Sequence, residues 1–386
     1  MSHRSITALA LVVTGALAVT TVSMPTAFAA DDENQAQSTV TPNSGTPTPE
    51  DTQASSNGAQ SGALALFDTT DEAGDENAST TPEPADDTPT TIIVQLEDGN
   101  VGIPWYNRLF GLSTSTKHET VKDRIETAVE SSVPGSDVTD VLDYTKAFDG
   151  FAIQAPASSL ETIKATQGVK AAFIERHLKP LVVEGDTGVS SVDAVNPDLK
   201  NGSSLEMTRA NQISQKGDKQ VIEVIDTGIE STHPAFSGPM DDVPVRLSHK
   251  DVESLVGTLS HGKQGAYLNK KIPFVFDYAD NDANVLPTST KDLSHGTHVA
   301  AIAAANAPDL QGTAPNAQII VAKVAADKDG SIPDSTVLAA LDDAVIIKPD
   351  SINLSLGDDA GWGSEAGTVY AEVYKNLAEA GVSVNA

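Results

Sequence analysis

Apolar positions in residues 91–180 alternate between the period of strands and the period of helices. Strands are expected at residues 91–96, 137–144, 148–155 and 169–175. A helix is expected at residues 117–131, where apolar side chains recur at the spacing of one helix face. The pattern Ser158-x-x-Glu161 predicts a capping box that opens a second, short helix. The resulting order, β-α-β-β-α-β, predicts a small ferredoxin-like α+β module.

From about residue 203 the pattern changes to nearly continuous apolar strands that alternate with helical segments. These strands are expected at residues 221–225, 318–324, 351–356 and 382–384. Helices are expected between them at residues 298–306, 336–345 and 365–380. Such alternation is typical of a parallel sheet that helices cover on both faces. The predicted fold class of this part is therefore α/β.

The first 90 residues have a different composition. Arg4, the apolar stretch at residues 6–24 and the sequence Ala27-Phe28-Ala29 predict a cleaved signal peptide at 1–29. We therefore expect a secreted protein without a stable membrane span after cleavage. Residues 30–90 hold 13 acidic and no basic residues and are rich in Thr and Pro. Such a composition predicts a disordered spacer, because it offers too little apolar surface to offset the entropy of ordering.

Charge and cysteine content exclude several classes of function. The chain has 24 basic and 54 acidic residues, a net charge of −30. This balance argues against nucleic acid as a partner, since phosphates require clustered basic residues. The chain contains no cysteine, which excludes a disulfide scaffold, a Cys-ligated metal and a thiol nucleophile.

Three segments place polar residues where catalysis occurs in parallel sheets, directly after the strands. Asp226 follows the apolar strand at 221–225, and His295 precedes a helix of small residues in SHGTHVAAIAAA. A third segment, SINLSLG, ends in Ser355-Leu356-Gly357. A carboxylate that accepts one imidazole N–H leaves the other nitrogen to act as a general base.

These segments, together with GTAPNAQIIVAKV at 312–324, resemble the subtilisin-like serine peptidases (subtilases) in order and approximate spacing. DYADNDANV at 277–285 is similar to the branch of cell-envelope proteinases and C5a peptidases. The resemblance implies an incomplete subtilisin-like parallel sheet and a secreted serine endopeptidase that hydrolyses extended polypeptides without a cofactor. It also implies that the module at 91–183 is a propeptide, which chaperones and inhibits the catalytic domain in cis.

The resemblance assigns roles residue by residue. Asp226 would orient the imidazole, His295 would be the general base, and His298 would have a structural role on its helix. The strands that flank a bound peptide would be formed by Gly330, Ser331 and Ile332 and by Ser355, Leu356 and Gly357. Such flanking strands bind an extended chain through its backbone.

The sequence also departs from the family pattern. No G-T-S-x-A motif, which carries the nucleophilic serine of the family, occurs in the 386 residues. We therefore expect residues 184–386 to be the N-terminal part of a catalytic domain and the chain by itself to be inactive. The alternative is a non-catalytic, truncated subtilase that acts as a propeptide-type inhibitor or peptide-binding module. Glu223 in a buried strand and Ala301 in place of a family glycine are also unusual.

Other interpretations stay open. A second D-T-G at Asp186 would fit an aspartic protease, although the two loops do not match. Asp292, His295 and His298 could bind a metal, although H-x-x-H lacks the usual i, i+4 spacing. The acidic loop with Asp277, Asp280 and Asp282 could bind calcium through oxygen ligands, although a solvated turn is favoured. Cell-wall association of the intact protein and a propeptide processing site within roughly 180–205 are further open expectations.

Overall fold

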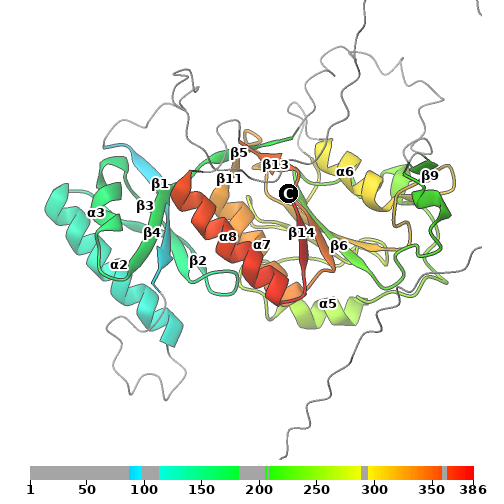
Figure 1. Cartoon of the computed structure of the whole chain (residues 1–386), viewed down its shortest axis with the longest axis horizontal. Coiled ribbons are helices and arrows are strands. Elements are labelled where there is room, and N and C mark those ends of the chain that lie inside the picture. The colour runs from blue at the N-terminus through cyan, green and yellow to red at the C-terminus, as the bar shows by residue number, and fades with distance from the viewer. Residues whose placement is uncertain (1–86, 98–112, 182–204, 207, 288–293, 359–362) are drawn as a thin grey trace, which may run out of the picture. The chain divides into compact units, whose positions relative to one another are not determined.

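The computed structural model describes residues 87–97, 113–181, 205–206, 208–287, 294–358 and 363–386 (Figure 1). The predicted signal peptide, all but the last residues of the predicted spacer, and the expected boundary between residues 183 and 184 lie outside these ranges. None of the helices in the described ranges combines the length and the apolar composition that crossing a membrane requires.

The first folded part has the predicted β-α-β-β-α-β order. Its elements are β1 (Pro89–Leu96), α2 (Ser113–Ser132), β2 (Thr139–Tyr144), β3 (Gly150–Pro156), α3 (Leu160–Lys164) and β4 (Val169–Ile174). The strands form an antiparallel sheet in the order β2-β3-β1-β4, which is the ferredoxin-like arrangement. β1 begins at Pro89, two residues before the expected start, because Pro89 and Thr90 pair with the end of β3.

The predicted capping box at Ser158 is wrong, although the helix that it announced exists. A 3₁₀ turn, η1 (Ala157–Ser159), precedes α3, and the N-cap of α3 is Ser159, whose side chain makes no capping hydrogen bond. The Ser158 hydroxyl instead donates to Asp87 Oδ1 at 3.3 Å. The pattern failed because Pro156 starts a tighter turn and moves the helix start by one residue.

The second folded part contains the predicted parallel sheet. Its strands are β6 (Val221–Asp226), β7 (Phe274–Asp277), β10 (Gln318–Lys323), β12 (Ser351–Asn353) and β14 (Ser383–Asn385), in the order β14-β12-β6-β10-β7. All neighbouring strands are parallel. The associated helices are α5 (His249–Val256), α6 (His295–Ala304), α7 (Asp334–Ile347) and α8 (Ser364–Glu379) (Figure 1).

Apolar side chains leave both faces of this sheet, which explains why its strands are continuous apolar runs. One core combines Ile225 and Ile320 with apolar residues of α7 and α8, and the opposite core combines Val224 and Val321 with alanines of α6. The predicted fold class, a parallel sheet with helices on both faces, is therefore confirmed.

Several elements of this part were not predicted, and one predicted strand is divided. β7 and α5 were not predicted, and the run expected at 351–356 forms β12 and a separate strand, β13 (Leu356–Gly357). β13 belongs to a different sheet, in which β5 (His177–Pro180) lies between β13 and β11 (Ile332–Pro333). The remaining short elements are η3 (Ala210–Gln212), η4 (Pro234–Phe236), β8 (Asn306–Ala307) and β9 (Leu310–Gln311).

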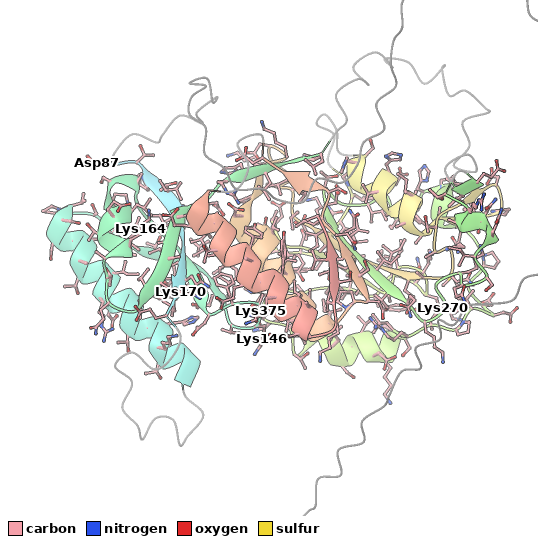
Figure 2. The ribbon with its side chains drawn as sticks, viewed as in Figure 1. Asp87, Lys146, Lys164, Lys170, Lys270 and Lys375 are labelled. Atoms are coloured by element: carbon pink, nitrogen blue, oxygen red, sulfur yellow. The ribbon has the colours of Figure 1, made fainter. Side chains whose placement is uncertain are left out.

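Helices α7 and α8 hold the first folded part through polar contacts. The buried Asp342 on α7 accepts hydrogen bonds at Oδ1 from the backbone N–H groups of residues 145–147, at 2.7–3.1 Å. Lys170, labelled in Figure 2, donates to Glu372 on α8 at 2.6 Å, and the labelled Lys164 lies 3.5 Å from Glu365. A carboxylate oxygen that receives three backbone N–H groups holds them firmly, so Asp342 is a specific anchor for the turn between β2 and β3.

Candidate active site

Asp226 is the last residue of β6, in the middle of the parallel sheet. Its side chain is 1% exposed, and its Oδ1 accepts a hydrogen bond from the backbone N–H of Thr227 at 2.7 Å. The chain turns away at Gly228, whose φ of +101° favours glycine and where a Cβ would lie 2.5 Å from Val285 O. The end of the strand thus fixes a buried carboxylate at the carboxyl edge of the sheet.

His295 is the first residue of α6 and faces this carboxylate. Its Nδ1 lies 2.9 Å from Asp226 Oδ1 and 3.0 Å from Oδ2. The close approach of α6 requires Gly296, because a Cβ there would lie 2.3 Å from Gly228 O and 3.0 Å from Asp226 Oδ1. Gly296 N also donates to Thr227 Oγ1 at 3.1 Å. The sequence His295-Gly296 therefore places the imidazole against Asp226.

This pair has the geometry of general-base catalysis. When Asp226 accepts the Nδ1 proton, the unprotonated nitrogen of the imidazole is Nε2. The buried carboxylate also stabilises the imidazolium that forms when Nε2 takes a proton. Nε2 lies 3.4 Å from the carbonyl oxygen of Leu181, so the backbone that follows β5 passes directly over the proposed base.

An extended segment of the chain occupies the cleft beside His295. β5 pairs antiparallel with β11 through Leu178 and Ile332, and antiparallel with β13 through Pro180 and Leu356. Beyond β5, Leu181 N donates to Ser355 O at 2.9 Å. The segment at 177–181 is therefore held through its backbone on both edges.

The residues predicted to flank a bound peptide occupy two kinds of position. Ile332, Ser355, Leu356 and Gly357 all contact or pair with the segment at 177–181. Gly330 and Ser331 lie in the turn before β11, where Gly330 N donates to Ala326 O and Ala326 N donates to Ser331 O. At Gly357 a Cβ would lie 2.8 Å from Leu181 Cδ2, so this glycine leaves room for the side chain of the bound segment.

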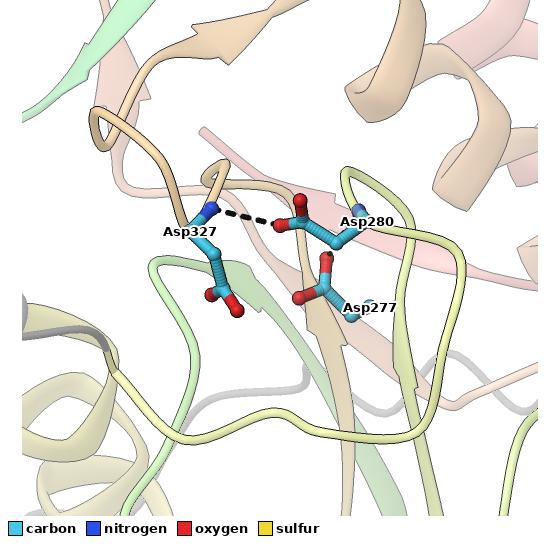
Figure 3. Close-up of side chains that lie close together, drawn as sticks. All are labelled: Asp277, Asp280 and Asp327. Carbon is cyan, nitrogen blue, oxygen red and sulfur yellow. Dashed lines mark hydrogen bonds between the residues drawn. The ribbon is translucent and has the colours of Figure 1, made fainter.

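A cluster of three carboxylates lies at the end of β7 and β10 (Figure 3). Asp277, Asp280 and Asp327 are the one group in the described ranges whose oxygens lie close enough together to hold a metal ion. The buried Lys323 ammonium contacts Asp277 and lies 2.6 Å from Asp327 Oδ1 and 3.6 Å from Asp280 Oδ2. We call these four residues the Lys323 cluster.

The Lys323 cluster supplies its own cation. Burial opposes the charged ammonium, but the hydrogen bonds that it donates to Asp277 and Asp327 outweigh burial and raise the pKa of Lys323. The loop for which a solvated turn is favoured over calcium contains Asp282 in place of Asp327, and Asp282 Oδ1 accepts from Asn284 N at 2.7 Å. Sequence spacing could not identify Asp327, which is 47 residues from its partner Asp280. With Lys323 between them, these carboxylates do not fit a metal ion.

Glu223 carries the second unusual carboxyl group of β6. The residue is fully buried, and neither carboxyl oxygen has a hydrogen-bond partner among the described residues. Burial raises the pKa of Glu223 to about 8, and the nearby Asp343 carboxylate adds to this effect. Asp343 itself accepts from the backbone N–H groups of residues 260–262 and from the Tyr278 hydroxyl. Glu223 is therefore protonated at neutral pH.

The alternative sites receive little support from the described residues. The side chain of His298 is exposed on α6, and Asp292 lies outside the described ranges, as does Asp186 of the second D-T-G. Asp226 faces an imidazole, whereas an aspartic protease requires a second carboxyl group at that place.

Ala301, the residue that stands in place of a family glycine, is partly buried against the alanine-rich core below α6.

A buried carboxylate after a central parallel strand, a histidine at the start of the next helix and an extended segment beside it thus meet at the carboxyl edge of the sheet. Comparison with known proteins supports a family: residues 217–384 match the model of the Subtilase family. The resemblance inferred from the motifs is thus confirmed.

Several curated relatives match this chain. The PI-type proteinase of Lactococcus lactis subsp. cremoris is 32% identical over 226 residues, which cover 56% of this chain and 11% of the proteinase. The C5a peptidase of Streptococcus pyogenes is 26% identical over 256 residues, covering 64% of this chain and 20% of that peptidase. Subtilisin-like protease SBT2.4 of Arabidopsis thaliana is 29% identical over 273 residues, which cover 63% of this chain and 30% of that protease. The matched region is thus about a tenth of the length of the first of these relatives.

Proposed function

We propose that this chain is part of a secreted serine endopeptidase precursor that hydrolyses peptide bonds in extended polypeptides. The observation that carries the proposal is the Asp226–His295 pair directly below the backbone of a strand-paired segment. Asp226 holds the imidazole with Nε2 towards the bound chain, and His295 takes the proton of the nucleophile and passes it to the leaving amine. The family segment at 217–384 and the serine proteinase relatives support the same reaction.

Residues 91–183 act as the propeptide in this proposal. Their last strand, β5, fills the cleft, and Leu181 O lies 3.4 Å from His295 Nε2. A substrate cannot pair with β11 and β13 while β5 does, so the precursor is inhibited in cis until this segment leaves. Secretion follows from the predicted signal peptide at 1–29, and N-terminal sequencing of the exported protein should begin near residue 30.

The test measures peptide-bond hydrolysis by the secreted gene product on a quenched-fluorescent casein substrate. His295→Ala should abolish hydrolysis, and Asp226→Asn should reduce it about 10⁴-fold, because the imidazole is then held in the wrong tautomer. A matched control, His298→Ala, removes the exposed histidine of the same helix and should retain activity. Near-normal hydrolysis in Asp226→Asn or His295→Ala would contradict the assignment, and inhibition by pepstatin would favour an aspartic protease.

A second function, the binding of extended polypeptides without hydrolysis, is favoured by one observation, the pairing of the segment at 177–181 with β11 and β13. Peptide-bond hydrolysis by this mechanism requires a nucleophile beside the base. A non-catalytic chain would still bind extended polypeptides in the cleft. Treatment of the 386-residue chain with a fluorophosphonate probe separates the two functions, since labelling of a serine would identify a nucleophile within the chain and no labelling is expected.

A further inference from the structure

The segment that occupies the cleft is basic, in contrast to the rest of this acidic chain. Residues 176–181 read Arg-His-Leu-Lys-Pro-Leu, so two of six are Arg or Lys and none is acidic, whereas the whole chain has 24 Lys and Arg against 54 Asp and Glu residues. His177 lies near Asp329, whose pKa is lowered first by hydrogen bonds from Ser331 and to a smaller extent by the charge of His177. One carboxylate beside this segment, that of Asp329, thus interacts favourably with it.

The most specific of these charge contacts joins Arg176 and Asp334. Arg176 Nε donates to Asp334 Oδ2 at 3.0 Å and a terminal nitrogen of its guanidinium donates to Oδ1 at 2.9 Å. The Asp334 side chain is 0% exposed. The two parallel bonds match the fork of a guanidinium, which the single ammonium of lysine cannot reproduce.

The Asp334 carboxylate also accepts a hydrogen bond from the backbone of residue 176. Arg176 N donates to Asp334 Oδ2 at 2.9 Å, and Asp334 N donates to Arg176 O at 3.0 Å. The Tyr370 hydroxyl from α8 donates to Asp334 Oδ1 at 2.7 Å and fixes the carboxylate from the other side. Asp334 is thus held in place before the arginine arrives, which favours recognition over simple charge attraction.

Residue 176 stands at a defined distance from the proposed catalytic centre. It precedes β5 by one residue and Leu181, at His295 Nε2, by five residues. Because β5 is extended and paired on both edges, any chain bound in its place aligns in the same register. A substrate would therefore present to Asp334 the side chain five positions before the residue at His295.

We propose that Asp334 is a specificity-determining residue that selects extended polypeptides with arginine five positions before the residue at His295. The inference rests on the proposed function in taking β5 to occupy the place of a substrate. A chain with glutamine at this position leaves the buried Asp334 carboxylate without its guanidinium partner, and an unpaired buried charge opposes binding. A chain with lysine restores the charge and loses the second hydrogen bond.

The experiment uses the 386-residue chain with Arg176→Glu, which places a carboxylate against Asp334 and weakens the hold on β5. Fluorescent hexapeptides copying residues 176–181, with Arg, Lys or Gln at the first position, are titrated and their anisotropy is measured. The Arg peptide should bind about tenfold more tightly than the Gln peptide, with the Lys peptide between them. Adding Asp334→Asn should make the three affinities nearly equal, whereas adding Asp329→Asn, an exposed carboxylate nearby, should keep the order.

A second measurement follows the protein's own segment. In Arg176→Gln and in Asp334→Asn, hydrogen exchange of the Leu181 amide, which donates to Ser355 O, should be about tenfold faster than in the parent chain. Equal affinities of the Arg and Gln peptides would overturn the inference. If no peptide binds, an unchanged hydrogen-exchange rate of the Leu181 amide in Asp334→Asn would overturn it as well. Neither measurement requires hydrolysis, so failure of the proposed peptidase function would leave the arginine preference intact.

Discussion

Replacing Glu223 with glutamine should stabilise the folded chain at neutral pH. The substitution removes a negative charge that residue 223 carries in the unfolded chain but not in the folded one. The fully buried carboxyl group has a pKa of about 8 in the fold, against 4.5 for an exposed glutamate. At pH 7 the unfolded chain ionises Glu223 and the folded chain keeps it protonated. Folding therefore includes taking up a proton at a pH that lies 7 − 4.5 = 2.5 above the ordinary pKa.

The magnitude follows from this interval. Each pH unit between the two pKa values costs about 1.4 kcal/mol, so Glu223 lowers the free energy of unfolding by about 3 kcal/mol at pH 7. The sign is that of an acid whose pKa is raised in the fold: the loss is absent below pH 4.5, grows as the pH rises, and levels off above about pH 8. Glutamine cannot ionise, so Glu223→Gln should remove this pH dependence.

The assay is urea unfolding of the 386-residue chain, followed by circular dichroism at pH 4.5, 6 and 7 and constant ionic strength. The variant should exceed the parent by about 3 kcal/mol at pH 7 and by less than about 1 kcal/mol at pH 4.5. A matched control, Glu230→Gln, removes an exposed glutamate just beyond the same strand and should change little. A difference between variant and parent that stays constant with pH would refute the reasoning.

Three further perturbations test other parts of the structure. Lys323→Met should lower the free energy of unfolding by about 3 kcal/mol, because it leaves the carboxylates of the Lys323 cluster unpaired, and millimolar Ca²⁺ should raise the melting temperature of this variant only; a variant that ignores Ca²⁺ would contradict this. His118→Gln should destabilise residues 89–174 more at pH 6 than at pH 9. Burial opposes the imidazolium, but the hydrogen bonds that it donates to Asp143 and Asp149 outweigh burial and raise the pKa of His118, so the stabilisation is complete below pH 6.5 and is lost as the pH rises through the raised pKa; equal losses in thermal melts at both pH values would count against it. Asp342→Asn should speed hydrogen exchange of the amides of residues 145–147 about tenfold, since an amide oxygen accepts more weakly than a carboxylate; unchanged exchange would show that the anchor is dispensable.

Elements with a strong local signal could be predicted from the sequence. β6 and β10 are buried on both faces, so their apolar runs are long enough to recognise, although Glu223 interrupts the run of β6. β7 has only four residues, FVFD, which are too few to establish a period. α5 buries only Val252, so its apolar pattern is weak, although its capping box at Ser248 and Asp251 was a usable signal.

The candidate site divides in the same way. Asp226 and His295 are recognisable because each stands at the end of a strong local pattern, and the family motifs place them in one site. Asp334 and Asp342 are not recognisable, because their partners are backbone or side-chain groups of residues 158 and about 195 positions away. No local pattern encodes such pairings, and acidic residues in a helix usually indicate its solvated face. The structure shows instead that both carboxylates are fully buried.

The position of β5 between β11 and β13 sets a width requirement on anything that takes its place. Neighbouring strands lie about 4.8 Å apart, so the slot between the two flanking strands admits one strand and no more. A polypeptide that enters must have both of its backbone edges free, and a strand inside a folded sheet or a turn of helix has neither. A segment must therefore unfold locally before its side chains can be selected by the slot. Among proteins with equally suitable residues, we expect the one whose segment opens most often to be bound first.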